Sequence, residues 1–103
     1  MRILLMCANG LSTGILMNKM KDWSKKNGTD LEVKAVPVDD CAGIYKEYDC
    51  LLIGPQMAYK LKEVQRIAPD RPVDTINPQD YALGRVDNIM KRVNELVNGG
   101  KQI

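Results

Sequence analysis

Residues 3–14 read Ile-Leu-Leu-Met-Cys-Ala-Asn-Gly-Leu-Ser-Thr-Gly. The apolar residues at the start are continuous rather than alternating, which predicts a strand over 2–6 that is buried on both faces of a sheet. The small and polar residues that follow predict a loop, and Ser12 is placed to cap a helix over 12–26. This stretch therefore predicts a strand, a loop that opens with Cys7, and a helix in direct succession.

Strand and helix patterns alternate along the rest of the chain. A helix with apolar residues at Ile15, Leu16, Met20 and Trp23 ends at cations and Gly28. A strand over 31–36, in which apolar and polar residues alternate, is followed by a short helix over 41–47 that Asp39 or Asp40 can cap. A fully apolar strand over 50–53, a helix over 56–68 and a strand over 73–76 come next. The last helix begins at Asn77-Pro78, is interrupted near Gly84 and stops at Gly99-Gly100. The signals used are periodicity, caps and Gly/Pro breaks.

Four such units predict an α/β fold with an open four-stranded parallel sheet and helices on both faces. The two fully apolar strands (2–6 and 50–53) should be central, and the alternating strand (31–36) should lie at an edge. The expected strand order is 2-1-3-4, with a single domain over residues 1–103. Ligands in such sheets bind at the carboxyl ends of the strands beside the switch point, where Cys7 falls.

Composition excludes several function classes. The net charge of +2 over 103 residues, with Lys and Arg dispersed, gives no reason to expect nucleic acid. Apolar runs are too short to span a membrane or to form a signal peptide, so we expect a cytoplasmic chain. Three cysteines without a Cys-x-x-Cys pair fit a reducing compartment. Because histidine is absent, a His-containing metal site and a His base within the chain are excluded, and we expect no metal or cofactor.

The loop after Cys7 is suited to holding an anion. Backbone N–H groups of Asn9, Gly10, Leu11, Ser12 and Thr13 can surround a phosphoryl group, and the two hydroxyls can add donors. The same groups would stabilise a Cys7 thiolate, which makes the cysteine a candidate nucleophile. A strand-end cysteine can also be a small core residue, and that interpretation fits Cys50 and, as an incidental residue at a helix start, Cys41.

Two other phosphate-binding loops are close in pattern. Low-molecular-weight tyrosine phosphatases and related arsenate reductases also have a cysteine after the first strand, followed six residues later by an arginine. Here that position is Thr13, and no arginine lies between residues 3 and 65. The missing guanidinium favours a loop that holds a phosphoryl group over one that hydrolyses it, so a phosphatase or reductase is the alternative. The nucleotide-binding P-loop pattern does not occur.

Three segments together resemble the enzyme IIB component of the bacterial sugar phosphotransferase system, in its lactose/cellobiose/chitobiose/lichenan group. They are the Cys-x-x-Gly-x-Ser-Thr loop at residues 7–13, Leu-Leu-Ile-Gly-Pro-Gln-Met-Ala-Tyr at residues 51–59, and Arg-Pro-Val-Asp-Thr-Ile at residues 71–76, with Tyr81 and Gly84 after it. The resemblance covers essentially the whole chain. Asn9 and Gly14 depart from the small residues and serine that are frequent at those positions, which leaves the paralogue open.

The resemblance implies a phosphotransferase of the EC 2.7.1 type that forms a phosphocysteine at Cys7. The phosphoryl group would come from a phosphohistidine of enzyme IIA and pass to a sugar during uptake through the membrane component IIC. It implies a chain that is monomeric alone and peripheral to the membrane through IIC. Pro55, Gln56 and Tyr59 would form a neighbouring wall, and Leu11 and Met57 could dock partners. A β-linked disaccharide or oligosaccharide such as cellobiose or chitobiose is expected, although the sugar itself is not readable from this chain. A regulatory IIB-like module is a further alternative.

Overall fold

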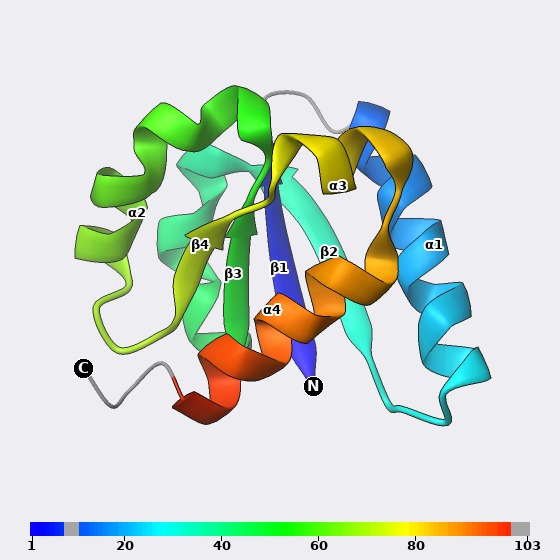
Figure 1. Ribbon diagram of the computed structural model, residues 1–103. Helices are drawn as coiled ribbons and strands as arrows, with labels where there is room; N and C mark the ends of the chain where they lie inside the picture. Colours follow the sequence, from blue (N-terminus) through cyan, green and yellow to red (C-terminus); the bar gives the residue numbers. More distant parts are fainter. Residues whose placement is uncertain (8–10, 100–103) are drawn as a thin grey trace.

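The strands form one parallel sheet in the predicted order. The computed structural model describes residues 1–7 and 11–99, with side chains over 1–6 and 14–98. The strands, in the spatial order β2-β1-β3-β4, are β1 (Arg2–Cys7), β2 (Glu32–Pro37), β3 (Cys50–Ile53) and β4 (Val73–Thr75). The two fully apolar strands occupy the centre and the alternating strand lies at an edge (Figure 1). The expected fold class and strand order are confirmed.

The helical segments agree with the predicted positions but differ in type. They are α1 (Leu11–Lys26), η1 (Val38–Gly43), η2 (Tyr45–Glu47), η3 (Pro55–Lys60), α2 (Leu61–Ile67), α3 (Pro78–Leu83) and α4 (Val86–Gly99), where η marks a 3₁₀ helix. The helix predicted over 41–47 is two 3₁₀ turns, closed by Ile44 N–H to the Cys41 carbonyl and Tyr48 N–H to the Tyr45 carbonyl. The helix predicted over 56–68 begins as η3 and becomes α-helical at Leu61.

Two of the predicted helix caps are wrong. The helix α1 begins at Leu11, so Ser12 lies inside its first turn rather than at the N-cap. The 3₁₀ helix η1 begins at Val38, directly after Pro37, and no side chain caps it. Asp39 and Asp40 therefore lie within the first turn of η1. In both places the helix begins before the polar residue, so the polar residue lies inside the helix and not at the N-cap position.

The continuous apolar runs are explained by two cores, one on each face of the sheet. Ile3 and Leu5 of β1 pack in a core with α1 and α4, whereas Leu4 and Met6 pack in a second core with η1, η2 and α2. All four side chains are at most 1% exposed. Figure 1 shows α4 crossing one face of the sheet while η1 and η2 lie behind the other. Because successive strand residues point to opposite faces, a central strand covered on both sides has no polar position.

A side-chain cap at Asn77 starts α3, as predicted. The Asn77 Oδ1 atom accepts hydrogen bonds from the N–H of Gln79 (2.8 Å) and of Asp80 (3.4 Å), and Pro78 occupies the first helical position. Gly84 ends α3 with φ of 65°, a conformation that side chains other than glycine rarely adopt. The interruption predicted at Gly84 is confirmed, and α4 follows from Val86.

Removal of the Asn77 cap is expected to destabilise the chain. We expect Asn77→Ala to lower the free energy of unfolding by about 0.5–2 kcal/mol, because two N–H groups of α3 lose their acceptor. Urea unfolding followed by circular dichroism measures the change. Asn94→Ala, at an exposed position inside α4, is the matched control and should leave stability unchanged or slightly raised, since alanine favours helix. Equal losses in the two variants would contradict a capping role.

Candidate functional site

The backbone of Cys7 lies at the carboxyl end of the central strand β1. Cys7 is the last residue of β1 and is in register with Pro37 of β2. On the other side, the Gly54 N–H donates to the carbonyl oxygen of Met6 at 2.9 Å, one residue before Cys7. Since β1 is hydrogen-bonded on both sides, the position of the Cys7 backbone is fixed by the sheet. It is also the strand beside the switch point, where this class of sheet binds ligands.

The amino terminus of α1 follows Cys7 after three residues. Leu11, Ser12 and Thr13 form the first turn of this sixteen-residue helix, and the N–H groups of a first turn have no partner within the helix. Four peptide steps separate Cys7 from Leu11, so the two Cα atoms are at most about 14 Å apart. No acidic residue lies in the first turn. The positive end of the helix dipole is therefore within about 14 Å of the Cys7 Cα atom and is not neutralised by an acidic residue of that turn.

Part of the predicted phosphate loop lies outside the described residues. This is the case for Asn9 and Gly10, and for the side chains of Cys7, Leu11, Ser12 and Thr13. Their assignment as nucleophile and phosphate-binding residues stays a prediction. What the structure adds is the backbone on either side of the loop: the end of β1, which pairs on both sides, and the start of α1.

Gly54, Pro55 and Gln56 lie beside this strand end. Gly54 is buried in the turn between β3 and η3, and a Cβ built on it would lie 3.2 Å from Gln56 Oε1 and 3.5 Å from the Met6 carbonyl oxygen. The side chain of Gln56 therefore folds back over Gly54 toward the carboxyl end of β1. The aromatic ring of Tyr81 is also close, with Cε2 3.9 Å from the same point. The predicted wall of Pro55 and Gln56 is thus adjacent to β1, and Tyr81 joins it.

Sequence reasoning missed a cavity that adjoins this wall. It has a volume of about 370 Å³ and lies between the first half of α1, Gln56 and α3. Ile15, Lys19 and Tyr81 contribute side chains to it, with Ala82 and Gly84 from the end of α3. Ile15 follows the helical spacing of the apolar residues in α1, and its side chain is 66% exposed. The spacing of apolar residues predicts a helix, but it does not show which of these residues lie beyond the sheet. The exposure of Ile15 therefore could not be predicted from the pattern.

Lys19 is the one cation among the described residues that line this cavity. Its aliphatic chain packs against Gly84, where any Cβ would contact Lys19 Cδ at 2.8 Å. Gly84 thus meets two requirements, a positive φ and the close approach of Lys19. Lys19 and Gly84 are far apart in sequence, so this contact could not be predicted from local patterns. In the sequence, the glycine alone hints at a close approach at that position.

Among the described contacts, none joins Tyr59 to Gly54. Its side chain is 75% exposed, its hydroxyl donates to the Met57 sulfur at 3.7 Å, and the Lys60 ammonium lies 5.9 Å from the ring centroid. Met57 is partly buried against the core on the α2 face. The role predicted for Tyr59 as a wall residue stays a prediction, while Met57 has a structural role in addition to any docking role.

Cys41 and Cys50 are core residues. Both are 0% exposed. Burial raises the pKa of the Cys50 thiol to about 12, with the nearby Asp74 carboxylate adding to the rise, and burial also raises the pKa of the Cys41 thiol. Both side chains therefore stay protonated at neutral pH, and a protonated thiol is not a nucleophile. No group of His, Cys, Asp and Glu that could hold a metal ion occurs within the described ranges.

The raised pKa of Cys50 makes stability depend on pH in the alkaline range. The thiol of the unfolded chain ionises near pH 9, its ordinary value, whereas the folded one ionises near pH 12. The contribution of Cys50 is therefore complete below pH 9 and is lost as the pH rises toward 12. We expect urea unfolding to show a steeper loss of stability between pH 8 and 10.5 in the wild-type chain than in Cys50→Ala. Parallel curves would contradict this linkage.

Gly54 offers a test of the wall that leaves the cysteine in place. Gly54→Val places branched carbons against the Met6 carbonyl, and we expect the carboxyl end of β1 to shift, with a stability loss of about 1–3 kcal/mol. A displacement of this kind can reduce transfer roughly tenfold to a hundredfold. The measurement is the rate at which the chain takes up a phosphoryl group. Gly43→Val is the matched control, because a Cβ on Gly43 meets no atom within 4 Å; equal rates in both variants would refute the coupling.

Sequence comparisons show which family the chain belongs to. The family described as "PTS system, Lactose/Cellobiose specific IIB subunit" matches residues 2–92. The chain is 35% identical over 103 residues to the "PTS system galactose-specific EIIB component" of Lactococcus lactis subsp. cremoris, covering 93% of this chain and 95% of that one. It is 39% identical over 67 residues to the oligo-beta-mannoside-specific EIIB component of Bacillus subtilis, covering 65% of each.

Solved structures share the fold. The cellobiose-specific phosphotransferase IIB component of Borrelia burgdorferi superposes with a TM-score of 0.79 at 24% identity, covering 95% of this chain and 92% of that one. The lactose-specific IIB domain of Streptococcus pneumoniae gives a TM-score of 0.77 at 14% identity, covering 88% of this chain and 95% of that one. Within the described ranges, no helix is both long enough and apolar enough to cross a bilayer. By its sequence match over residues 2–92, this chain belongs to the lactose/cellobiose-specific IIB family of the phosphotransferase system.

Proposed function

We propose that Cys7 is the phosphoryl carrier of this IIB component. The Cys7 thiolate attacks the phosphorus of a phosphohistidine on enzyme IIA, an S–P bond forms, the N–P bond breaks, and the imidazole keeps the electron pair and takes up a proton. In the second step a sugar hydroxyl oxygen attacks the same phosphorus. The S–P bond then breaks, the thiolate leaves, and the hydroxyl proton passes to a base. The membrane component IIC presents the sugar, and the chain acts at the cytoplasmic face.

The observation that carries the proposal is the position of the Cys7 backbone between a strand end fixed by the sheet and the amino terminus of α1. Backbone N–H groups of residues 9–13 would bind the phosphoryl oxygens, and the α1 dipole would favour both the thiolate and the phosphorylated state. Because the chain has no histidine, the phosphohistidine must come from a partner. This agrees with family membership and explains how a cysteine can act without a neighbouring base.

Hydrolysis of the phosphocysteine is disfavoured in the proposal. The arginines that the structure shows in polar contacts serve other elements: Arg2 binds Glu32 at 2.9 Å, Arg71 binds the carbonyls of Tyr48 and Lys46, and Arg92 binds Asp74 at 2.8 Å. With no arginine in the loop, the guanidinium used by phosphatases to stabilise phosphoryl transfer to water is missing. The proposed product of phosphorylation is therefore a persistent phosphocysteine that waits for a sugar acceptor.

The sugar is proposed to be a β-linked disaccharide or oligosaccharide. Relatives named for galactose, cellobiose and oligo-beta-mannoside are 35–39% identical to this chain. Relatives of such similar identity that are named for different sugars suggest that selection lies mainly in IIC. We therefore assign the transfer step to this chain and the choice of sugar to its membrane partner.

Mass spectrometry tests the proposal. The chain is incubated with phosphoenolpyruvate, the general phosphotransferase proteins and candidate IIA proteins. We expect one phosphoryl adduct, located at Cys7 by peptide fragmentation, and its loss when IIC and sugar are added. An adduct on any other residue would refute the assignment. Turnover of a free aryl phosphate or arsenate by the chain alone would instead support the phosphatase or reductase alternative.

A further inference from the structure

The outer edge of β2 is open. The strand β2 is the first in the order β2-β1-β3-β4 and pairs with β1 alone within the described ranges. The Glu32 N–H donates to the Met1 carbonyl at 2.9 Å, so Glu32 faces β1. In a parallel strand, alternate residues direct both backbone groups to the same side, so Val33 and Ala35 direct theirs outward. An edge with unpaired backbone groups is a template for another strand.

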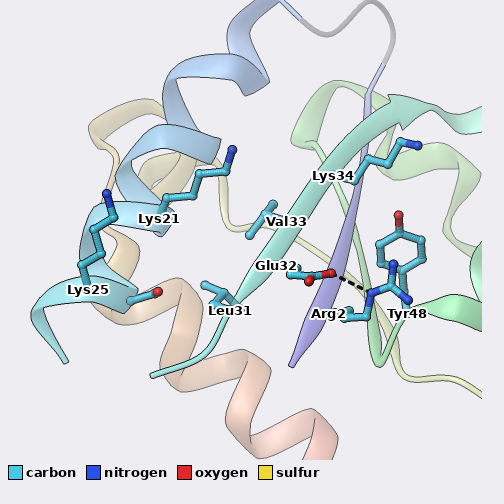
Figure 2. A pocket seen from close by; sticks show the side chains of 9 residues that line it. Arg2, Lys21, Lys25, Leu31, Glu32, Val33, Lys34 and Tyr48 are labelled. Carbon is cyan, nitrogen blue, oxygen red and sulfur yellow. Dashed lines mark hydrogen bonds and ion pairs between the residues drawn. The ribbon is translucent and has the colours of Figure 1, made fainter. Parts of the chain in front are cut away.

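A cavity of about 570 Å³ runs along this edge. Figure 2 shows β2 crossing the view with Val33 on it and Leu31 just before it, and with Lys21 and Lys25 of α1 to one side. Lys21 and Lys25 are four residues apart and therefore share one face of α1. The same helix contributes Ser24 to the lining. One wall of the cavity is thus a helix face that carries two ammonium groups beside the open edge of β2.

The opposite wall is also cationic. Figure 2 places Arg2, Lys34 and Tyr48 on the other side of β2. The Arg2 guanidinium binds Glu32 Oε2 at 2.9 Å and lies 5.0 Å from the centre of the Tyr48 ring. Glu32 is the one acidic residue in the lining and is already paired with Arg2. The lysines of both walls have no ion pair within the described ranges, so the positive charge of this edge is uncompensated.

We propose that this edge binds an acidic, extended peptide segment of a partner protein, which adds to the sheet as a fifth strand beside β2. Its backbone pairs with the outward groups of Val33 and Ala35, and its carboxylates contact Lys21 and Lys25 on one face and Lys34 on the other. Successive side chains of an added strand point to opposite faces of the sheet, which matches the cations on both walls. The segment is short, because Pro37 has no N–H and ends the template.

A lipid headgroup or a compact polyanion fits the edge less well. Neither of them supplies the regularly spaced backbone donors and acceptors that Val33 and Ala35 require. The Glu32 carboxylate in the lining would also repel a compact polyanion. An extended peptide can instead have a neutral residue at the position next to Glu32. The open backbone and the charge pattern therefore point to the same occupant.

The probe is an acetylated and amidated octapeptide of sequence Glu-Glu-Val-Val-Glu-Glu-Val-Val, which places glutamates on both faces of an added strand and valine N–H groups on both of its edges. At low salt, NMR titration of the whole chain should show the amide signals of Val33 and Ala35 shifting with added peptide. Their hydrogen exchange should slow in the complex. The Lys34 amide is the internal control, because it already faces β1 and should keep its exchange rate. An octapeptide with lysine in place of glutamate should not bind.

Lysine variants test the charge contribution. Lys21→Ser, Lys25→Ser and Lys34→Ser should each weaken binding roughly two- to fivefold, while Lys62→Ser, on exposed α2, should not. These lysines are at the surface, so folding should be retained. Phosphoryl uptake at Cys7 should be unchanged in all of them, which separates this proposal from the proposed function.

Three results would overturn the proposal. One is the absence of any shift at millimolar peptide. Another is equal binding of a peptide with N-methylated valines, which cannot donate backbone hydrogen bonds and would reveal a purely electrostatic surface. The third is lysine-dependent binding to phosphatidylglycerol vesicles without peptide binding, which would assign the edge to a membrane.

Discussion

Phosphoryl uptake is expected to be abolished when Cys7 is replaced by serine. The serine hydroxyl stays protonated at neutral pH, where the thiolate is the attacking group. Loss of a covalent nucleophile reduces transfer by on the order of 10³-fold or more. The measurement is the rate of adduct formation by mass spectrometry with phosphorylated IIA as donor. Because the Cys7 backbone ends a strand that is hydrogen-bonded on both sides, we expect the fold to survive the substitution.

Cys41→Ala is the matched control for that experiment. Cys41 is buried in the core on the η1 face, and its removal should leave the rate of phosphoryl uptake unchanged at equal concentrations of folded chain. Retention of the wild-type rate by Cys7→Ser, or its loss in Cys41→Ala with the fold intact, would rule out Cys7 as the carrier. Circular dichroism of each variant separates lost chemistry from lost structure.

Leu51→Ala is expected to have the largest effect on stability. Leu51 is 0% exposed in the centre of β3, and its side chain packs in the core with α2. Truncation of a buried leucine costs about 2–5 kcal/mol through lost burial and the cavity left behind. A chain of this length is stable by roughly 5–15 kcal/mol, so the melting temperature should fall by roughly 10–30 °C.

Leu83→Ala makes the same chemical change at an exposed position. The Leu83 side chain is 59% exposed at the end of α3, and we expect a change within about 0.5 kcal/mol. Urea unfolding of both variants gives the comparison directly. Similar losses at the two positions would show that burial in the two cores does not set the stability of this sheet.

The sequence predicted the sheet well because its signals are local. A strand covered on both faces has to be apolar throughout, and residues 2–6 and 50–53 are. The Asn77-Pro78 cap and the break at Gly84 also depend on single residues with specific backbone preferences. The strand order followed from which runs were fully apolar. Each of these predictions rests on one residue or one short run, and the structure confirms them.

What the sequence did not predict depends on contacts between distant residues. The 3₁₀ geometry of η1 and η3 was not expected from the sequence, because 3₁₀ and α segments have similar apolar spacing over so few residues. The exposure of Ile15 and the contact of Lys19 with Gly84 depend on where α3 lies against α1. Tyr81 follows the third segment that resembles the family, but its closeness to Gly54 arises only when the chain is folded. In the candidate site, the assignments of Cys7 and of the wall stay predictions, and the cavity beside them was not expected from the sequence.

The length of β1 determines how the two ends of the molecule can be used. Arg2 and Cys7 are the first and last residues of this strand, and at about 3.3 Å per residue they are about 17 Å apart. The proposed peptide edge begins at the Arg2 end, and the proposed phosphoryl carrier Cys7 is at the other end. Occupation of one end does not block the other. A partner that carries an acidic segment would therefore raise the effective concentration of its own phosphoryl-transferring domain at Cys7, and its turnover would depend on the length of the linker.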